Sequence, residues 1–253
     1  MKISSWNVNS LRVRLPQVLE WLDSSAVDIL CLQETKTQDP DFPQEDIENA
    51  GYQVVFSGQK TYNGVAILSK QTATDIVTDV KDLDDPQRRI LAATIGDVRV
   101  INLYVVNGSE VGSEKFEYKL HWLEKVTAFI NQEIKKHKKL VVLGDFNITP
   151  DDRDVHDPEA WKGKILCSDE ERAAYQTLLG CGLTDTFRLF DQEEKAFSWW
   201  DYRGGGFRRN HGMRIDLILA TAALTTTCKQ SVIDKTPRAW ERPSDHTPVI
   251  AEF

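Results

Sequence analysis

The apolar residues of this chain are gathered into short runs, each about as long as one β-strand. Several runs contain β-branched residues and end at Gly, Asn or Asp, which favours buried strands over segments of helix. The clearest runs are Asp28–Leu32, Gly64–Leu68, Arg99–Val106, Leu140–Leu143, Ile215–Ala220 and Pro248–Phe253. A further run, Ile90–Ile95, is joined to Arg99–Val106 at "GD", which suggests an antiparallel pair.

Three stretches between these runs have helical character. They are Pro16–Leu22, Ser113–Lys136 and Ser168–Leu179, the last of which opens with the capping-box pattern "SDEE". Helices alternate with strands, yet neighbouring strands also pair in antiparallel fashion. Two sheets packed face to face with helices outside satisfy both observations. No Pro/Ser-rich linker or fixed-period repeat interrupts the sequence, so we expect a single α/β domain spanning residues 1–253.

Composition restricts the class of protein. Apolar residues make up 41% and charged residues 28% of the chain, which is typical of a soluble globular protein. No apolar run approaches the roughly 18 residues of a membrane helix, and the opening "MKISSWNVNS" lacks the apolar region of a signal peptide. The four cysteines are far apart and form no C-x-x-C pair, so we expect neither disulfides nor a zinc site, and a cytoplasmic location.

Net charge bears on the kind of partner. A formal charge of −8 argues against a protein that coats nucleic acid by bulk charge. It leaves open a basic face above an acidic pocket, because the local field matters more than the total charge. Basic residues do cluster, for example at Arg203–Arg209 and Lys135–Lys139. The second cluster also suits the C-terminus of a helix, where the helix dipole favours positive charge, so clustering alone is only suggestive.

Polar and ionisable residues stand where the apolar runs begin or end. They are Asn7, Asn9, Glu34, Tyr104, Asn107, Asp145, Asn147, Asp216, Asp245 and His246. Because side chains alternate along a strand, Asn7 and Asn9 are expected to share a face, as are Asp145 and Asn147.

Each of these residues has an ordinary explanation when taken alone. Asp and Asn cap turns by hydrogen-bonding their own backbone, a Glu at a strand end is usually solvated, and a single His is often structural. Six strand ends of this kind are harder to dismiss, since burying unpaired carboxylates costs free energy. If the ends converge, the acids need a cation or a shared proton. The residues by themselves leave two interpretations open: ordinary turns, or a metal-dependent hydrolytic site.

Nine segments together carry a resemblance to a known family. They are "WNVNSLR", "LQETK", "GVAILSK", "LYVVNGSE", "GDFNITP", "LTDTFR", "FSWWDYR", "MRIDLILA" and "SDHTPV". In this order and spacing they resemble the exonuclease III class of apurinic/apyrimidinic (AP) endonucleases, within the endonuclease/exonuclease/phosphatase fold. The resemblance covers nearly the whole chain. It implies a four-layer α/β sandwich whose site lies at one edge of two mixed sheets.

The resemblance also implies an activity. The expected reaction is hydrolysis of DNA phosphodiesters, both 5′ to abasic sites and at blocked 3′ ends, with Mg²⁺ as cofactor and Mn²⁺ as an alternative. The expected partner is double-stranded DNA carrying abasic or 3′-blocked lesions. We expect the protein to be a monomer that does not bind membranes. By motif, Glu34 would be the principal metal ligand, Asn7 would assist on the metal side, and Asp245 would be a ligand or an outer acid.

The remaining roles follow from the same motifs. His246 would contact the scissile phosphate, with Asp216 as its carboxylate partner. Asp145 would orient or deprotonate the attacking water, which Asn147 would hold in line. Hydrogen bonds around the phosphate and a pocket for the base-less sugar complete the expected site. The residues assigned to them are Tyr104 and Asn107 at the phosphate, Trp199, Met213 and Ile215 in the apolar pocket, and Arg203, Arg208 and Arg209 toward flanking phosphates.

The sequence departs from the family pattern at four places. Val106 stands where many relatives have Pro, which loosens that turn, and Asn9 stands where some have Asp, which removes one acid near the metal. Glu110 replaces a basic residue that some relatives insert into DNA, so wedging of the strands there is in doubt. The segment around Cys167 also differs, and its shape bears on the balance between abasic cleavage and 3′-end trimming.

Two other functions are compatible with the fold. One is a phosphoesterase of the same scaffold that acts on a non-DNA substrate, and the aromatic and arginine content of Trp199–Arg209 disfavours it. The other is a catalytically silent relative that binds RNA or protein. Such a protein would have lost its metal and phosphate ligands, whereas Glu34, Asp145, Asp216 and His246 are all present here.

Overall fold

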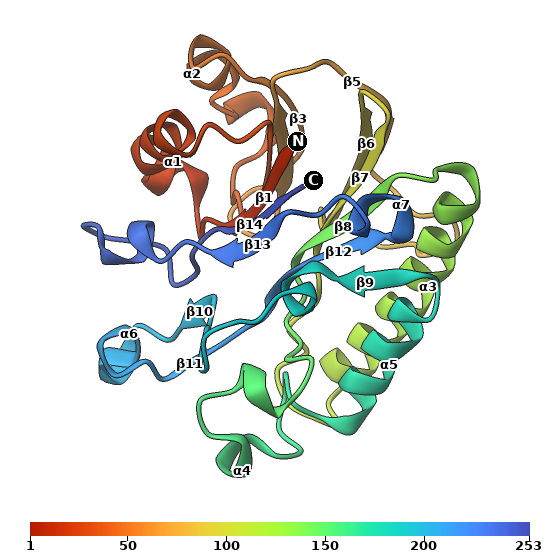
Figure 1. Cartoon of the computed structure of the whole chain (residues 1–253), viewed down its shortest axis with the longest axis vertical. Helices are drawn as coiled ribbons and strands as arrows, with labels where there is room; N and C mark the ends of the chain where they lie inside the picture. Colours follow the sequence, from red (N-terminus) through yellow and green to blue (C-terminus); the bar gives the residue numbers. More distant parts are fainter.

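The computed structural model describes residues 1–253 as two six-stranded β-sheets, a short ribbon and flanking helices (Figure 1). The strands of the first sheet lie in the order β13 (Gln230–Ile233), β14 (Val249–Glu252), β1 (Lys2–Asn7), β2 (Ile29–Gln33), β4 (Val65–Ser69) and β3 (Gln53–Ser57). Those of the second lie in the order β5 (Ala73–Val77), β6 (Ile90–Ile95), β7 (Val98–Tyr104), β8 (Leu140–Asp145), β12 (Asp216–Thr221) and β9 (Leu183–Asp185). Each sheet holds one parallel pair, β1 with β2 and β7 with β8, among antiparallel ones.

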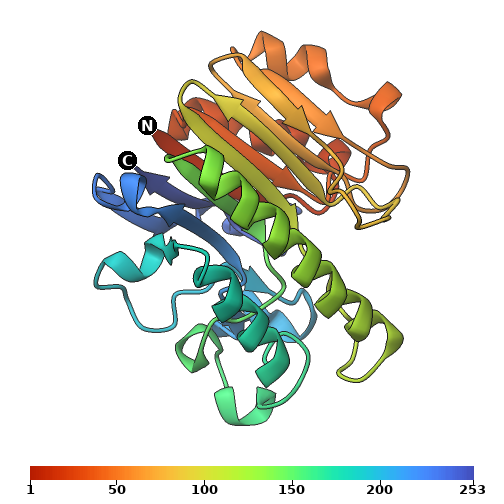
Figure 2. The same ribbon diagram turned by 90° about the vertical axis from the view of Figure 1, so that its right-hand side faces the viewer.

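Helices cover the outer face of each sheet. The first sheet carries α1 (Leu11–Ser25) and α2 (Gln44–Asn49), and the second carries α3 (Glu114–Lys136) and α5 (Asp169–Leu179), which lie side by side in Figure 2. The connections contain α4 (Pro158–Trp161), α6 (Gly206–Arg209), α7 (Ala222–Thr225) and the ribbon of β10 (Trp199–Trp200) and β11 (Gly212–Met213). Single 3-10 turns lie at Asp39–Asp41, Asp152–Asp154, Thr186–Leu189, Arg203–Gly205 and Thr236–Ala239. None of the helices combines the length and hydrophobicity that crossing a lipid bilayer requires.

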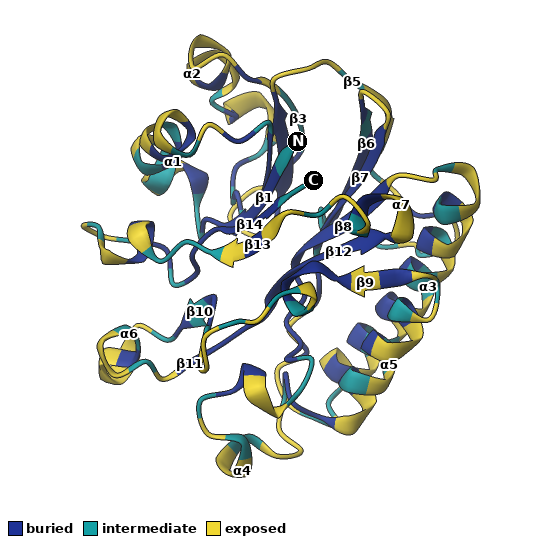
Figure 3. Ribbon diagram, viewed as in Figure 1, coloured by how far each residue is buried: buried dark blue, intermediate teal, exposed yellow.

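Three apolar clusters fill the interfaces between the four layers. Alternate residues of a strand enter different clusters, as the two-residue period of a strand requires. In β2, Cys31 faces the other sheet, whereas Leu30 and Leu32 pack beneath α1 and α2. In β8, Val141 faces the other sheet and Val142 packs beneath α3. The central strands are therefore buried on both faces while the helices expose one side, as Figure 3 shows. The predicted four-layer sandwich of two mixed sheets is confirmed.

The predicted boundaries need correction at the first helix. The helix was expected to begin at Pro16, but it begins at Leu11, and Pro16 lies inside it. The apolar stripe explains the longer helix, because Leu11, Val18 and Leu22 are all buried against the sheet. A proline forgoes one backbone hydrogen bond in a helix interior, and this packing outweighs that loss.

The register of the strands brings their polar ends together. In the second sheet, Tyr104 lies opposite Asp145, which in turn lies opposite Asp216. In the first sheet, Asn7 lies opposite Gln33, the residue that precedes Glu34. The ends named in the sequence thus lie in two rows at one edge of the sandwich.

We predict that Gly144→Ala strongly destabilises the protein. Gly144 has φ +144°, and a Cβ atom there would lie 1.8 Å from the carbonyl oxygen of Leu103 in the neighbouring strand. Strain and overpacking together are expected to lower the free energy of unfolding by about 2–4 kcal/mol, measured by urea denaturation. The control is Gly51→Ala, at φ +88° with no atom in the way, which should cost only about 1 kcal/mol. Equal losses for the two variants would contradict the steric argument.

Candidate active site

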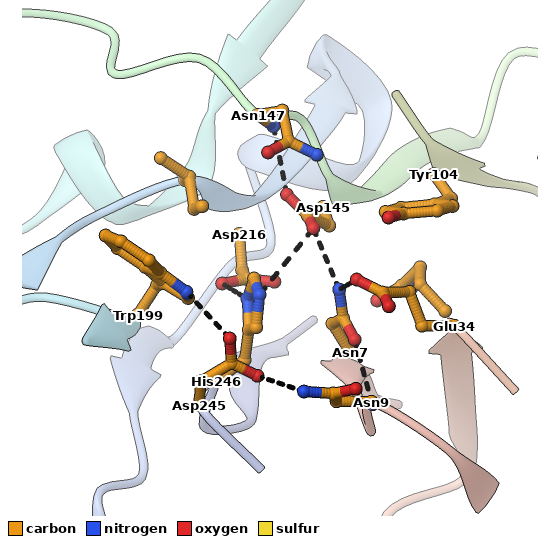
Figure 4. A network of polar contacts seen from close by, with 12 residues as sticks. Asn7, Asn9, Glu34, Tyr104, Asp145, Asn147, Trp199, Asp216, Asp245 and His246 are labelled. Atoms are coloured by element: carbon orange, nitrogen blue, oxygen red, sulfur yellow. Dashed lines mark hydrogen bonds and ion pairs between the residues drawn. The ribbon is translucent and has the colours of Figure 1, made fainter. Parts of the chain in front are cut away.

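The polar strand ends converge on one cluster of side chains (Figure 4). Oxygen and nitrogen ligand atoms of Glu34, Asp145 and His246 all lie within 4.8 Å of one another. Asp145 and His246 are buried, and Glu34 is partly exposed. Residues from both sheets contribute, so the cluster exists only because the two sheets pack face to face.

Asp145 serves two purposes at the end of β8. Its Oδ1 accepts a hydrogen bond from the backbone N–H of Asn147 at 2.9 Å, which closes the turn after the strand. Its Oδ2 accepts from Asn7 Nδ2 at 2.9 Å and lies 3.7 Å from His246 Nε2. One carboxylate oxygen of Asp145 thus closes the turn, and the other faces the polar cluster.

Asn7 connects the two sheets. Its Nδ2 donates to Glu34 Oε1 and to Asp145 Oδ2, each at 2.9 Å, while its Oδ1 accepts from the backbone N–H of Asn9 at 3.0 Å. The amide nitrogen, and not the oxygen, faces the carboxylates. We predicted that strand alternation would place Asn7 with Asn9, and Asp145 with Asn147, on a shared face. Alternation does not apply, because Asn9 and Asn147 lie beyond the ends of β1 and β8, with φ of 44° and 48°.

Glu34 lies on a left-handed turn directly after β2, at φ 49°. Lys36 Nζ lies 2.8 Å from Glu34 Oε2 and donates to Asn9 Oδ1 at 2.6 Å. Burial opposes ionisation of Glu34, but the charge of Lys36 and the hydrogen bond from Asn7 hold its pKa below the usual value. Sequence analysis missed Lys36, although "LQETK" places a cation two residues after the acid.

His246 is paired with Asp216 at the start of β12. The distance from His246 Nδ1 to Asp216 Oδ2 is 2.8 Å, and Ser198 Oγ donates to the same oxygen at 2.7 Å. Burial disfavours the imidazolium, yet the nearby carboxylates of Asp216, Asp145 and Asp245 outweigh it and raise the pKa of His246 well above its ordinary value. Ser198 was also missed, because no local pattern marks a serine 18 residues away as the partner of Asp216.

The same surroundings also raise the pKa of Asp145. Burial raises its pKa, and the negative charges of Asp216 and Glu34 add to that effect, while His246 and the Asn7 hydrogen bond oppose it. Both ring nitrogens of His246 face carboxylates, Nδ1 toward Asp216 and Nε2 toward Asp145. An imidazole protonated at both nitrogens has no lone pair for a metal, and in that state the carboxylate oxygens would be the ligand atoms for a cation.

These carboxylates fit a hard divalent cation. Mg²⁺ binds proteins through one or two carboxylates and completes its shell with water and substrate oxygens. Glu34 and Asp145 supply that number within one cluster. Asp245 is differently placed, because its two oxygens accept from Asn9 Nδ2 at 2.9 Å and from Trp199 Nε1 at 3.1 Å. Burial raises the pKa of Asp245, but His246 and these two donors bring it below its usual value.

Tyr104, Asn107 and Asn147 line the side of the cluster formed by β7 and β8. Tyr104 lies beneath the guanidinium of Arg89, 4.6 Å from the ring centre. Burial and the charges of Glu34 and Asp145 raise the Tyr104 pKa well above its usual value, so the phenol keeps its proton. Asn107 Nδ2 donates to Asn147 Oδ1 at 3.0 Å, and Asn147 Nδ2 donates to a backbone carbonyl at 3.0 Å.

An apolar cluster adjoins the polar one. Met213 and Ile215 are buried in it, and the indole of Trp199 packs against it from a partly exposed position. Its other members are Val155, Leu166 and Cys167, with Trp161 and Ile165 at the rim. Cys167 thus contributes to the wall of this region.

The predicted arginines lie outside the cluster. The side chain of Arg203 is 92% exposed and pairs with Asp201 at 2.9 Å. Arg208 and Arg209 are exposed on α6. The structure therefore brings together the predicted acids, amides and histidine with Tyr104 and Trp199. The three predicted arginines are exposed outside this cluster.

Comparison with known proteins agrees with this geometry. Residues 4–246 match the model of the Endonuclease/Exonuclease/phosphatase family. The chain is 39% identical to exodeoxyribonuclease III of Haemophilus influenzae, with both sequences covered completely. A 3′ phosphatase from Neisseria bound to a product DNA hairpin is 50% identical, with a TM-score of 0.98 over 100% of this chain and 99% of that one. An AP endonuclease from Archaeoglobus fulgidus is 39% identical, with a TM-score of 0.96 over the same shares of the two chains. The resemblance predicted from the nine segments is confirmed, and the chain belongs to the endonuclease/exonuclease/phosphatase family.

Proposed function

We propose that this chain is a divalent-metal-dependent DNA repair nuclease that cleaves phosphodiesters 5′ to abasic sites and removes blocking groups from 3′ ends. The observation that carries the proposal is the buried network in which Asn7 bridges Glu34 to Asp145, and Asp145 faces the Asp216–His246 pair. The similar proteins include an exodeoxyribonuclease, a DNA 3′ phosphatase and an AP endonuclease. All three reactions are hydrolyses of a phosphate ester, so one site can serve them.

Mg²⁺ is the proposed cofactor, with Mn²⁺ as an alternative. Glu34 is the proposed principal ligand, Asn7 holds its carboxylate in place, and Asp245 acts indirectly by orienting Asn9. A bound divalent cation supplies positive charge to the phosphate and to the leaving oxygen. Lys36 already partners Glu34 and keeps the acid ionised, ready to bind a cation.

Asp145 is the proposed acceptor of a proton from the attacking water. Its Oδ2 faces the cluster, and burial makes that carboxylate more basic than an exposed one. Asn147 Oδ1 accepts one hydrogen bond from Asn107 and keeps a second lone pair that can orient the water. The water oxygen forms a bond to phosphorus as its proton passes to Asp145, the bond from phosphorus to the 3′ oxygen breaks, and that oxygen takes a proton from solvent to become a 3′ hydroxyl.

His246 is the proposed donor to the phosphoryl oxygen. Asp216 fixes the ring through Nδ1, which leaves the Nε2 proton directed toward the cluster. An imidazolium there stabilises the negative charge that develops on the phosphate in the transition state. Tyr104 and Asn107 are proposed to donate further hydrogen bonds to the same phosphate.

The apolar cluster is the proposed pocket for the sugar that lacks a base. Trp199, Met213 and Ile215 lie next to the polar cluster and offer no hydrogen-bonding edge to a base. Extruding a nucleotide costs least where no base pairing or stacking is lost, so such a pocket favours abasic sites. The exposed Arg208 is proposed to meet phosphates flanking the lesion, as is Arg203 if it exchanges Asp201 for a phosphate.

We also propose a monomer that works in the cytoplasm. Only six large hydrophobic side chains are exposed, which suits a chain that works alone. They are Val13, Tyr62, Ile76, Leu189, Tyr202 and Val232. All four cysteines are free thiols, as suits a reducing compartment.

The proposal is tested with three end-labelled duplexes: one abasic, one with a blocked 3′ end and one intact. We expect Mg²⁺-dependent nicking of the abasic duplex and release of the 3′ block, both abolished by a chelator and restored by added Mg²⁺. Soluble phosphate esters serve as the comparison substrate. Hydrolysis of those esters without cleavage of any duplex would reject a DNA substrate.

Replacing both cluster acids should remove metal binding and activity together. We predict that E34Q/D145N nicks abasic DNA at least about 10³-fold more slowly than wild type, because the loss combines the metal ligand and the water-activating base. Mn²⁺ binding, followed by electron paramagnetic resonance, should weaken in parallel, while circular dichroism stays native. E124Q, an exposed acid on α3, is the matched control and should behave as wild type. Undiminished cutting by E34Q/D145N would refute the site assignment.

Replacing His246 should slow turnover without weakening substrate binding. In H246N the amide can still donate to Asp216, but the positive charge at the phosphate is lost. We predict a fall in kcat on the order of 10²-fold or more with little change in KM, measured on the abasic duplex at saturating Mg²⁺. H121N, on the exposed side of α3, is the control. A kcat within a few-fold of wild type would remove His246 from the mechanism.

A further inference from the structure

Lys119 is a fully buried lysine that the chemistry described above does not use. It lies on α3 with no exposed surface, and its ammonium points away from solvent into the base of the site loops. The Nζ donates to the backbone carbonyls of Asn147 at 2.6 Å and Asn107 at 3.1 Å, and to the carboxylate of Glu171. Three donors meet three acceptors, so the ammonium is saturated.

The two carbonyls belong to the two amide residues of the site. Asn107 and Asn147 are 40 residues apart, on the loops after β7 and β8, and their side chains bond to each other at 3.0 Å. Lys119 therefore links the backbones of Asn107 and Asn147, while their side-chain amides bond to each other. Asn147 has a left-handed backbone, with φ 48°, so the direction of its amide depends on how that backbone is held.

Glu171 extends the same support to a third loop. Besides Lys119, its Oε1 accepts from the backbone N–H of Leu166 at 3.1 Å. Its Oε2 accepts from the backbone N–H and the hydroxyl of Ser168, at 3.1 Å and 2.6 Å. Leu166 is part of the apolar cluster beside the site. One buried ion pair thus anchors three of the loops beside the proposed phosphate and sugar positions, those that carry Asn107, Asn147 and Leu166.

Stability alone is a weak reason for this arrangement. Burial lowers the pKa of Lys119, and the attraction to Glu171 only partly offsets that desolvation. Well-packed apolar residues commonly replace a buried ion pair without loss of stability. What apolar residues cannot supply is three directed hydrogen bonds to the loops.

We propose that Lys119 is a positioning residue for phosphodiester hydrolysis: it holds the backbones of Asn107 and Asn147 directly and, through Glu171, the loop of Leu166. The inference rests on the proposed function, because it assumes that these amides meet the phosphate and the water. A misplacement of about 1 Å at reacting groups lowers rates by up to about 100-fold. Loosening these loops should therefore lower kcat, even though Lys119 touches no substrate.

The test is the double variant K119M/E171M, which removes both charges and keeps similar volumes. We expect a melting temperature within about 5 °C of wild type, a fall in kcat of about 10- to 100-fold and a KM within a few-fold on the abasic duplex. The matched control is R99M/E133M, which removes another buried ion pair involving α3, joined at 2.7 Å but far from the site loops. It should change stability by a similar amount and leave kcat unaltered.

A double-mutant cycle with Asn147 distinguishes a positioning role of Lys119 from a general effect on the structure. In an N147A background, adding K119M/E171M should cost only a few-fold more in kcat, because the amide being positioned is already gone. Independent, multiplicative losses, or wild-type kcat in folded K119M/E171M, would overturn the positioning role. Should K119M/E171M not fold, K119Q/E171Q retains amide donors without charge and is judged by the same criteria. Full activity of N147A would instead count against the proposed function, which keeps the two failures distinct.

Discussion

The structure depends on compensating negative charge at one edge of the sandwich. Glu34, Asp145, Asp216 and Asp245 converge there, and buried carboxylates repel one another strongly where water is excluded. Each acid has its own compensation: Lys36 beside Glu34, His246 between Asp216 and Asp145, and paired N–H donors on Asp245. The amide nitrogen of Asn7 lies between Glu34 and Asp145 and donates a hydrogen bond to each. Lys36 and a protonated His246 offset two of the four negative charges, and the negative charge that remains favours a divalent cation.

The distance between the two sheets sets the geometry of the site. Amide groups buried between the sheets fix that distance: Gln33 Nε2 donates to Asn102 Oδ1 at 2.7 Å, and Asn102 Nδ2 donates to the carbonyls of Leu32 and Ala66 at 2.9 Å. Such bonds have direction, whereas apolar packing tolerates sliding, so they specify one alignment. Glu34 follows Gln33 directly, so the hydrogen bond from Gln33 to Asn102 also fixes the position of Glu34 relative to Asp145.

The polar cluster and the proposed sugar pocket meet at neighbouring residues of the chain. Ile215 directly precedes β12 and is buried in the apolar cluster, whereas Asp216, the first residue of β12, is paired with His246. On the proposed function, changes in the pocket wall, such as those around Cys167, would alter which lesion is accepted while the chemistry stays fixed. The similar proteins are named as an exodeoxyribonuclease, a 3′ phosphatase and an AP endonuclease, and the proposed separation of pocket and chemistry accommodates that variety.

The sequence by itself determined the layers and the kind of chemistry, while the tertiary structure decided which residues meet. Long apolar runs predicted β2, β4, β7, β8 and β12, because strands buried on both faces must be apolar throughout. The edge strands β3, β5, β9 and β13 left no such run, since each is short or exposed along much of its length. The acids and His246 were identified from their motifs, but Lys36, Ser198 and Lys119 were not. Their roles come from contacts such as Lys119 with Glu171, 52 residues away, and such contacts leave no local pattern because strand register and layer packing alone create them.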